Sequence, residues 1–157
     1  MRTDHHGMQQ NHYRHLALMT ILSFLSMYVL MYAMVNAFGN VFNNVNQIYM
    51  AGLMTAPMVV IELLVMRGMY NDGSRNALIA GAAVLTGVAF FAAIRWQTAV
   101  GDTQFLRSMI PHHAAAVLMC EKAPIRDGEI RRLCESIISS QQAEIDQMKR
   151  RLSQLSK

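Results

Sequence analysis

The chain has 157 residues, 53% of them apolar, and a formal net charge of +4. Its apolar residues are concentrated in three blocks rather than spread as in a globular core, so a membrane protein is predicted. Most charged residues follow residue 100, and their small net charge excludes a nucleic-acid-binding surface.

Residues 1–15 form a predicted cytoplasmic tail rich in histidine, namely His5, His6, His12 and His15. Clustered histidines in a flexible segment bind divalent metal ions weakly. A solvated tail beside anionic headgroups explains the same residues. The tail is therefore an indication of metal binding with low specificity.

Three apolar runs follow the tail, and each is close to the ~20 residues that a helix needs to cross a bilayer. The first run is too long for the apolar part of a signal peptide, and no small-residue cleavage site follows it. The predicted transmembrane region covers residues 16–95, with spans at 16–38, 45–66 and 77–94.

The basic residues of the short loops predict the orientation. Arg2 and Arg14 precede the first span, Arg67 and Arg75 lie in the second loop, and the loop at 39–44 has no charge. Because positive segments stay in the cytoplasm, the N-terminus is predicted to be cytoplasmic. Three spans then place the C-terminal part outside, which in a bacterium is the periplasmic side of the inner membrane.

The second span carries methionines and one carboxylate at four-residue spacing, namely Met50, Met54, Met58 and Glu62. Methionine fills gaps in apolar packing, and it is also a preferred ligand of Cu(I). A carboxylate within a membrane is a functional candidate, although Glu62 lies near the cytoplasmic end, where it can reach the interface. The spacing favours a packing face and leaves a membrane path for metal as the alternative.

Residues 102–157 are predicted to form an extracytoplasmic antiparallel helical hairpin. Asp102 is expected to cap a first helix that runs to about Lys122, and Asp127 is expected to cap the second. Apolar residues alternate by three and four along both helices. This spacing predicts that the two helices face each other along a coiled-coil-like seam.

The predicted seam is polar and rich in sulfur. If Cys120 faces Cys134, then His113 faces Gln141. Outside the cytosol, the two cysteines fit either a disulfide that staples the hairpin or a thiol pair that binds metal. Burying a histidine or glutamine without a partner costs about 1–3 kcal/mol. We therefore expect these side chains to have a function in so small a domain.

A proline inside the first helix has soft metal ligands beside it. Pro111 removes one helical hydrogen bond, at a cost of about 3 kcal/mol. Met109, His112 and His113 have the spacing i, i+3 and i+4, which places them on one face. A thioether with imidazoles suits copper better than magnesium or calcium. Taken singly, His113 fits a buried histidine, His112 a surface residue and Met148 a core residue, but together with the cysteines they predict metal binding.

The hairpin also resembles a bacterial family catalogued as domain of unknown function 305. The matching residues are Asp102, Phe105-Leu106, Met109-Ile110-Pro111-His112-His113, Gln141, Glu144-Ile145 and Met148. The spans before it are similar to a membrane-anchored branch of that family. The resemblance implies a ferritin-like helical module associated with copper binding and tolerance. Its implied ligands are Met109, His112, His113 and Met148, with Gln141 and Glu144 in supporting roles.

Full-length domains of that family resemble two such hairpins in a four-helix bundle, whereas this chain has one. A lone hairpin cannot cover its own apolar seam, so a homo-oligomer is predicted to complete an all-α, ferritin-like bundle. The Glu-x-x-His pairs of di-iron bundles are absent from the sequence. The resemblance therefore implies copper and no iron chemistry.

The leading hypothesis is a protein anchored in the lipid bilayer that buffers Cu(I) in the periplasm or hands it to a copper-accepting partner. The sequence contains no nucleophile–base constellation, phosphate loop or dinucleotide fingerprint, so no enzymatic activity is expected. One alternative is an oligomerising membrane scaffold without metal. The other is a subunit of a metal transport assembly, with the methionine stripe lining the path.

Overall fold

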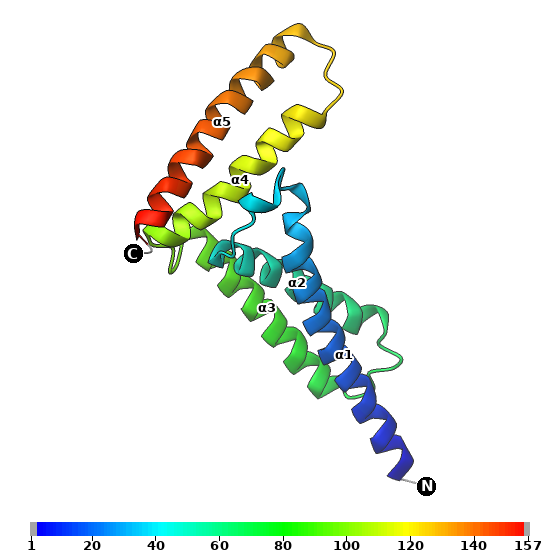
Figure 1. The fold of residues 1–157 in the computed structure, drawn as a ribbon. Coiled ribbons are helices and arrows are strands. Elements are labelled where there is room, and N and C mark those ends of the chain that lie inside the picture. Colours follow the sequence, from blue (N-terminus) through cyan, green and yellow to red (C-terminus); the bar gives the residue numbers. More distant parts are fainter. Residues whose placement is uncertain (1–2, 156–157) are drawn as a thin grey trace. The chain divides into compact units, whose positions relative to one another are not determined.

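A computed structural model describes residues 3–155, with side chains described from residue 11 onwards (Figure 1). The described chain is all-α, as predicted. Its helices are α1 (Thr3–Leu30), the 3-10 helices η1 (Met31–Met34) and η2 (Phe38–Asn40), α2 (Val45–Val65), α3 (Gly73–Arg95), α4 (Asp102–Lys122) and α5 (Gly128–Leu155). They form two compact units. The membrane unit comprises residues up to Leu30 with Ile48–Thr98, and the hairpin unit comprises Met31–Gln47 with the residues from Ala99 onwards.

Three helical segments are long and apolar enough to cross a bilayer, namely Asn11–Met34, Val45–Val65 and Gly73–Trp96. The number of predicted spans is thus confirmed, but two boundaries differ. The first α-helix ends at Leu30 rather than continuing to residue 38. The third begins at Gly73, because the Asp72 carboxylate accepts from the backbone N–H of Arg75 at 3.0 Å and caps the helix.

Small residues let α2 and α3 approach each other closely. A Cβ on Gly52 of α2 would overlap the ring of Phe90, and one on Gly87 of α3 would lie 3.1 Å from the Cβ of Ala56. Close approach at small residues is a common way for helices to pack in a membrane. A third of the apolar window of α2 is buried, against 6% for α1 and α3. The described contacts of the membrane unit therefore centre on α2.

The loop between α2 and α3 is tied to α1. The hydroxyl of Tyr13 donates to Oδ1 of Asn76 at 2.7 Å, and Nδ2 of Asn76 donates to the carbonyl of Tyr70 at 2.7 Å. The rings of Tyr13 and Tyr70 lie 5.3 Å apart, and the Arg75 guanidinium lies 5.9 Å from the Tyr13 ring centre. These contacts, a cation–π pair among them, close one end of the membrane unit.

The predicted hairpin is present in the second unit, where α4 and α5 pack against each other. Asp127 caps α5 as predicted, because its Oδ1 accepts from the N–H groups of Glu129 and Ile130 at 2.8 and 2.9 Å. The predicted cap by Asp102 is wrong. Gly101 occupies the cap position, and Asp102 lies in the first turn of α4. There its negative charge is stabilised by the positive end of the helix dipole.

The segment 31–47 covers part of the hairpin seam. Ile110, Ala114, Val117, Ile145 and Leu152 form the buried core of the hairpin unit, and Val35 and Phe42 pack against it. η1 and η2 both contact α4. The backbone N–H of Val45 also donates to Oε1 of Gln104 at 3.1 Å. The hairpin therefore obtains apolar cover from residues that the sequence analysis assigned partly to the first span.

Candidate metal centre

α4 carries three of the predicted ligands in one stretch. The helix continues through Pro111, which is buried, and Met109 beside it is half-buried. His113 is buried against α5, whereas His112 is exposed. The two imidazole rings lie 6.3 Å apart, centre to centre. The two imidazoles thus lie close together, one inside the hairpin and one at its surface, on the stretch of α4 that also carries Met109.

His113 is fixed on both sides of its ring. Its Nδ1 lies 2.9 Å from the carbonyl oxygen of Met109, one turn earlier in α4. Its Nε2 lies 2.7 Å from Oε2 of Glu144 on α5. The carboxylate side chain keeps 52% of its surface exposed while that of His113 keeps 10%. A buried imidazole is therefore tied to a carboxylate that stands at the surface.

The two contacts of His113 occupy both of its ring nitrogens. A carbonyl oxygen only accepts, so the contact with Met109 is a hydrogen bond when Nδ1 carries the hydrogen. Nε2, the other nitrogen through which a metal ion could bind, lies against the carboxyl of Glu144. In the structure neither nitrogen of His113 has a free lone pair, so metal binding here requires one contact to be exchanged.

The residue that contacts His113 differs from the predicted one. His113 meets Glu144, whereas the sequence analysis paired it with Gln141, one turn earlier on α5. Gln141 is half-buried. Met148, the predicted ligand on α5, packs against the apolar core beside Ile145. Glu144 was assigned a supporting role from the motif, and its direct contact with His113 was missed.

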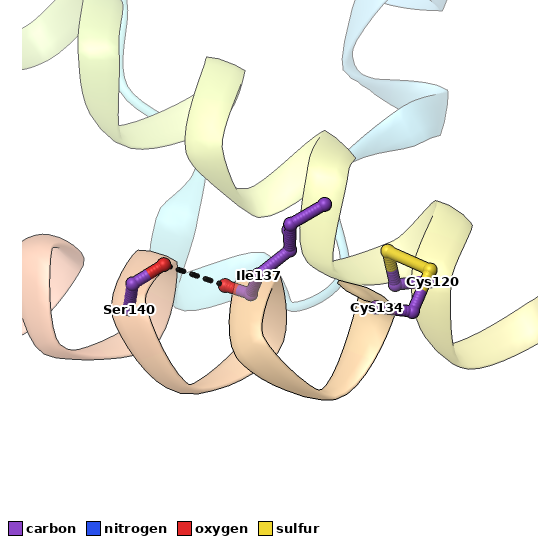
Figure 2. The surroundings of a disulfide bond; sticks show 4 residues. All are labelled: Cys120, Cys134, Ile137 and Ser140. Atoms are coloured by element: carbon purple, nitrogen blue, oxygen red, sulfur yellow. Dashed lines mark hydrogen bonds between the residues drawn. A yellow bond between two sulfur atoms is a disulfide. The ribbon is translucent and has the colours of Figure 1, made fainter. Parts of the chain in front are cut away.

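The two cysteines form a disulfide. Cys120 near the end of α4 is bonded to Cys134 near the start of α5, with their Cα atoms 5.1 Å apart (Figure 2). The predicted facing of these residues is therefore confirmed. The side chain of Ile137 points toward α4 on the same stretch of the hairpin. In this bonded form the sulfurs staple the hairpin and carry no thiolate for a metal.

The methionines of the second span lie on its outer surface. Met50 and Met54 are exposed and Met58 is half-buried, while the buried face of α2 consists of other residues. Within the described chain the buried face of α2 consists of Ala51, Gly52, Thr55, Ala56, Val59 and Leu63, and the interpretation of the methionine stripe as a packing face stays a prediction. Glu62 lies beside Tyr70, whose pKa is raised by burial and by the negative charge and hydrogen bond of Glu62.

Two of the four tail histidines have described side chains. His12 and His15 belong to α1, and Nδ1 of His15 lies 2.7 Å from the carbonyl of Asn11. The side chains of His5 and His6 lie outside the described residues. Among side chains that are described, no three from His, Cys, Asp and Glu gather closely enough to hold one metal ion.

Comparison with known proteins gives a family. Residues 65–153 match the family described as "Domain of unknown function (DUF305)". The chain belongs to this family. The match starts at the end of α2, so it includes α3 and extends well beyond residues 102–157, where the motif residues lie. A protein of Acanthamoeba polyphaga mimivirus described as "Uncharacterized protein L153" is 32% identical over 136 residues, which cover 85% of this chain and 88% of the viral protein. No solved structure matches the chain.

Proposed function

We propose that the protein is a copper-binding module anchored in the membrane, which buffers Cu(I) or hands it to a partner, without enzymatic activity. In this proposal the membrane is the bacterial inner membrane, the N-terminus is cytoplasmic and the hairpin unit is periplasmic. Three helices able to cross a bilayer support the anchor. The basic loops support the orientation.

The observation that carries the proposal is that His113 is oriented from two sides on a stretch of α4 that also carries Met109 and His112. Its imidazole is oriented by a carboxylate and a backbone carbonyl, the usual companions of a metal-binding histidine. Met109 and His112 belong to the same stretch of α4, and Met148 on α5 packs against the apolar core between the two helices. Thioether sulfur with imidazole nitrogen is a donor set suited to Cu(I).

The donor set fits copper on one condition. Nε2 of His113 must leave Glu144, which is feasible because that carboxylate is half exposed and can be hydrated by water. His112 is exposed and needs no such exchange. The bound ion would supply a soft cationic centre. The chain would then bind it through sulfur and imidazole, and Met109 would keep Nδ1 of His113 oriented through its carbonyl.

Cys120 and Cys134 enter the proposal only in the reduced state. Their disulfide leaves no thiolate, so they can bind Cu(I) only after two-electron reduction by an external dithiol. A reduced pair at this spacing suits a soft ion. The copper site at His113 and the thiol pair are therefore two separable parts of the proposal.

The proposed homo-oligomer rests on the uncovered half of the hairpin. Residues 31–47 pack against the core around Ile110, but Met119, Ile130 and Leu133 near the turn are more than half exposed. A second hairpin would bury such side chains in a four-helix bundle. This would retain the bundle expected from the sequence, with the segment 31–47 as an additional cover.

The direct test is competition for Cu(I) between the full-length protein in detergent and a chelator of known affinity. We expect binding that weakens at least tenfold when Met109, His112 and His113 are replaced by Leu, Ala and Ala. Met119→Leu provides a matched control, because Met119 is an exposed methionine of the same helix. Equal binding by the wild-type and the triple variant would refute copper binding at this site.

The structure also favours one rival, a scaffold without metal, because both nitrogens of His113 already have partners. Under that reading neither the wild-type protein nor the triple variant binds Cu(I) tightly, and the substitutions change only stability. The transport alternative predicts that Met54→Leu with Met58→Leu abolishes metal flux in vesicles. Under our proposal these two substitutions leave copper binding unchanged, so the three readings give different results.

A further inference from the structure

Two basic side chains occupy matching positions toward the end of the hairpin that lies away from the turn. Arg107 comes six residues before His113 on α4, and Lys149 comes five residues after Glu144 on α5. The two helices are antiparallel, so six residues back along α4 and five residues forward along α5 lead in the same direction. Both positions therefore lie about one and a half turns from the His113–Glu144 contact, away from the turn of the hairpin. Both side chains are half-buried. Two positive charges therefore lie in register across the hairpin.

The segment between the first two spans also lies beside these basic side chains. A Cβ built on Gly39 would lie 3.9 Å from Nζ of Lys149, so this ammonium group reaches η2. η2 also packs against α4, the helix that carries Arg107. Three elements of the hairpin unit thus contribute to the surroundings of the two charges.

No described carboxylate of the chain forms an ion pair with either of these two basic side chains. Nε of Arg107 is buried without a hydrogen-bond partner among the described residues. Asp146, the carboxylate one turn before Lys149, accepts from Gln142 at 3.3 Å instead. Burying a charged group without a partner is unfavourable. An anion from outside the chain would supply the missing partner.

The chain also tethers η2 near the bilayer. Phe38 follows four residues after Met34, where the first candidate span ends, and Asn40 precedes the start of the second by five. At ~3.3–3.6 Å per residue, the first connection holds η2 within roughly 15 Å of the end of the span. The side chain of Phe38 is 93% exposed. Exposed Phe side chains accompanied by Lys or Arg are typical of protein surfaces that lie at a membrane interface.

We propose that Arg107 and Lys149, with the turn Phe38–Asn40, bind the phosphate of an anionic phospholipid headgroup while the Phe38 ring contacts the acyl chains. Guanidinium and ammonium groups are the usual protein partners of phosphate. A lipid is favoured over free phosphate because the apolar ring and the tether belong to the same element as the site. The site is independent of copper binding.

The test uses the full-length protein in nanodiscs that contain phosphatidylcholine with increasing phosphatidylglycerol. Native mass spectrometry counts the phosphatidylglycerol molecules retained after release. Each of Arg107→Gln and Lys149→Gln should weaken retention about fivefold, and the double variant about 25-fold. Arg150→Gln is the matched control, since this neighbouring arginine is exposed. Thiol labelling checks that each variant retains its disulfide.

Three outcomes would overturn the site. The double variant could retain phosphatidylglycerol as well as the wild-type protein. Arg150→Gln could weaken retention as much as Lys149→Gln, which would reveal a general charge effect. Inorganic phosphate at the concentration of the lipid could displace it, which would assign the site to the free anion. Lys149→Arg keeps the charge, so it should retain lipid within about twofold of wild type.

Discussion

Removal of the disulfide gives a quantitative test of how the hairpin is held. Cys120 and Cys134 are separated by 14 positions. In the chain-entropy description, a loop of about 15 residues contributes about 3 kcal/mol by restricting the unfolded chain. Domains of this size are stable by only about 5–15 kcal/mol in total. Replacing both cysteines by serine should therefore remove a large part of the stability of the hairpin unit.

The assay is pulse proteolysis of the full-length protein in detergent over a urea series, which reports local unfolding without requiring the spans to unfold. The doubly substituted protein should have a lower urea midpoint, and wild-type protein treated with a reductant should match it. Reductant should have no effect on the variant. An unchanged midpoint in the variant, with the wild type shown by thiol labelling to be bonded, would refute the reasoning.

Three further predictions concern other parts of the fold. Asp127→Ala should cost about 1 kcal/mol in the same assay because two capping hydrogen bonds are lost, whereas Asp127→Asn should cost less. Gly52→Ala should cost about 1–3 kcal/mol in thermal unfolding in detergent, with partial rescue by Phe90→Leu, because the new methyl meets the Phe90 ring. The pKa of Tyr70 is raised above 10.0, so its neutral side chain stabilises the fold below pH 10, and this stabilisation is lost as the pH rises through the folded-state pKa. Tyr70→Phe should reduce the loss of stability at alkaline pH, as measured by unfolding at increasing pH.

The sequence predicted the helices and their order because each depends on local properties. Apolar runs of sufficient length marked the spans, and the capping carboxylate Asp127 marked the start of α5. The three–four spacing predicted that the two helices face each other, and the disulfide confirms the facing of Cys120 and Cys134 on which the register was based. Each of these features depends on a periodic pattern or on a few neighbouring residues. Hydropathy and residue spacing were therefore sufficient to predict them.

The end of the first span was predicted wrongly because hydropathy does not distinguish lipid contact from protein contact. The residues from Met31 to Phe38 are uncharged and mostly apolar, and they were counted as membrane-spanning. In the structure Val35 packs against the hairpin core, whose first residue, Ile110, lies 75 positions later in the sequence. Asn36 and Asn40, which hydrogen bond to each other at 2.7 Å, were the local indication of a turn.

The candidate site was predicted in composition but not in pairing. The spacing placed Met109 and His113 on one face of α4, and the structure joins them through the carbonyl contact. The partner on α5 depended on the register, which was set from the cysteines alone. The shift from Gln141 to Glu144 is under one turn, yet it exchanges a neutral amide for a carboxylate. An error of that size changes the chemistry of the pair entirely.

The distribution of contacts along the hairpin bears on how His113 can change partners. The disulfide holds α4 and α5 together on the turn side of the His113–Glu144 pair, and the core around Ile145 holds them on the other. Because both flanks are fixed, Glu144 can turn outward into solvent without separating the helices. Under the proposed function, metal exchange at His113 therefore leaves the hairpin folded. Reduction of the disulfide would remove one flank and couple the exchange to opening of the turn.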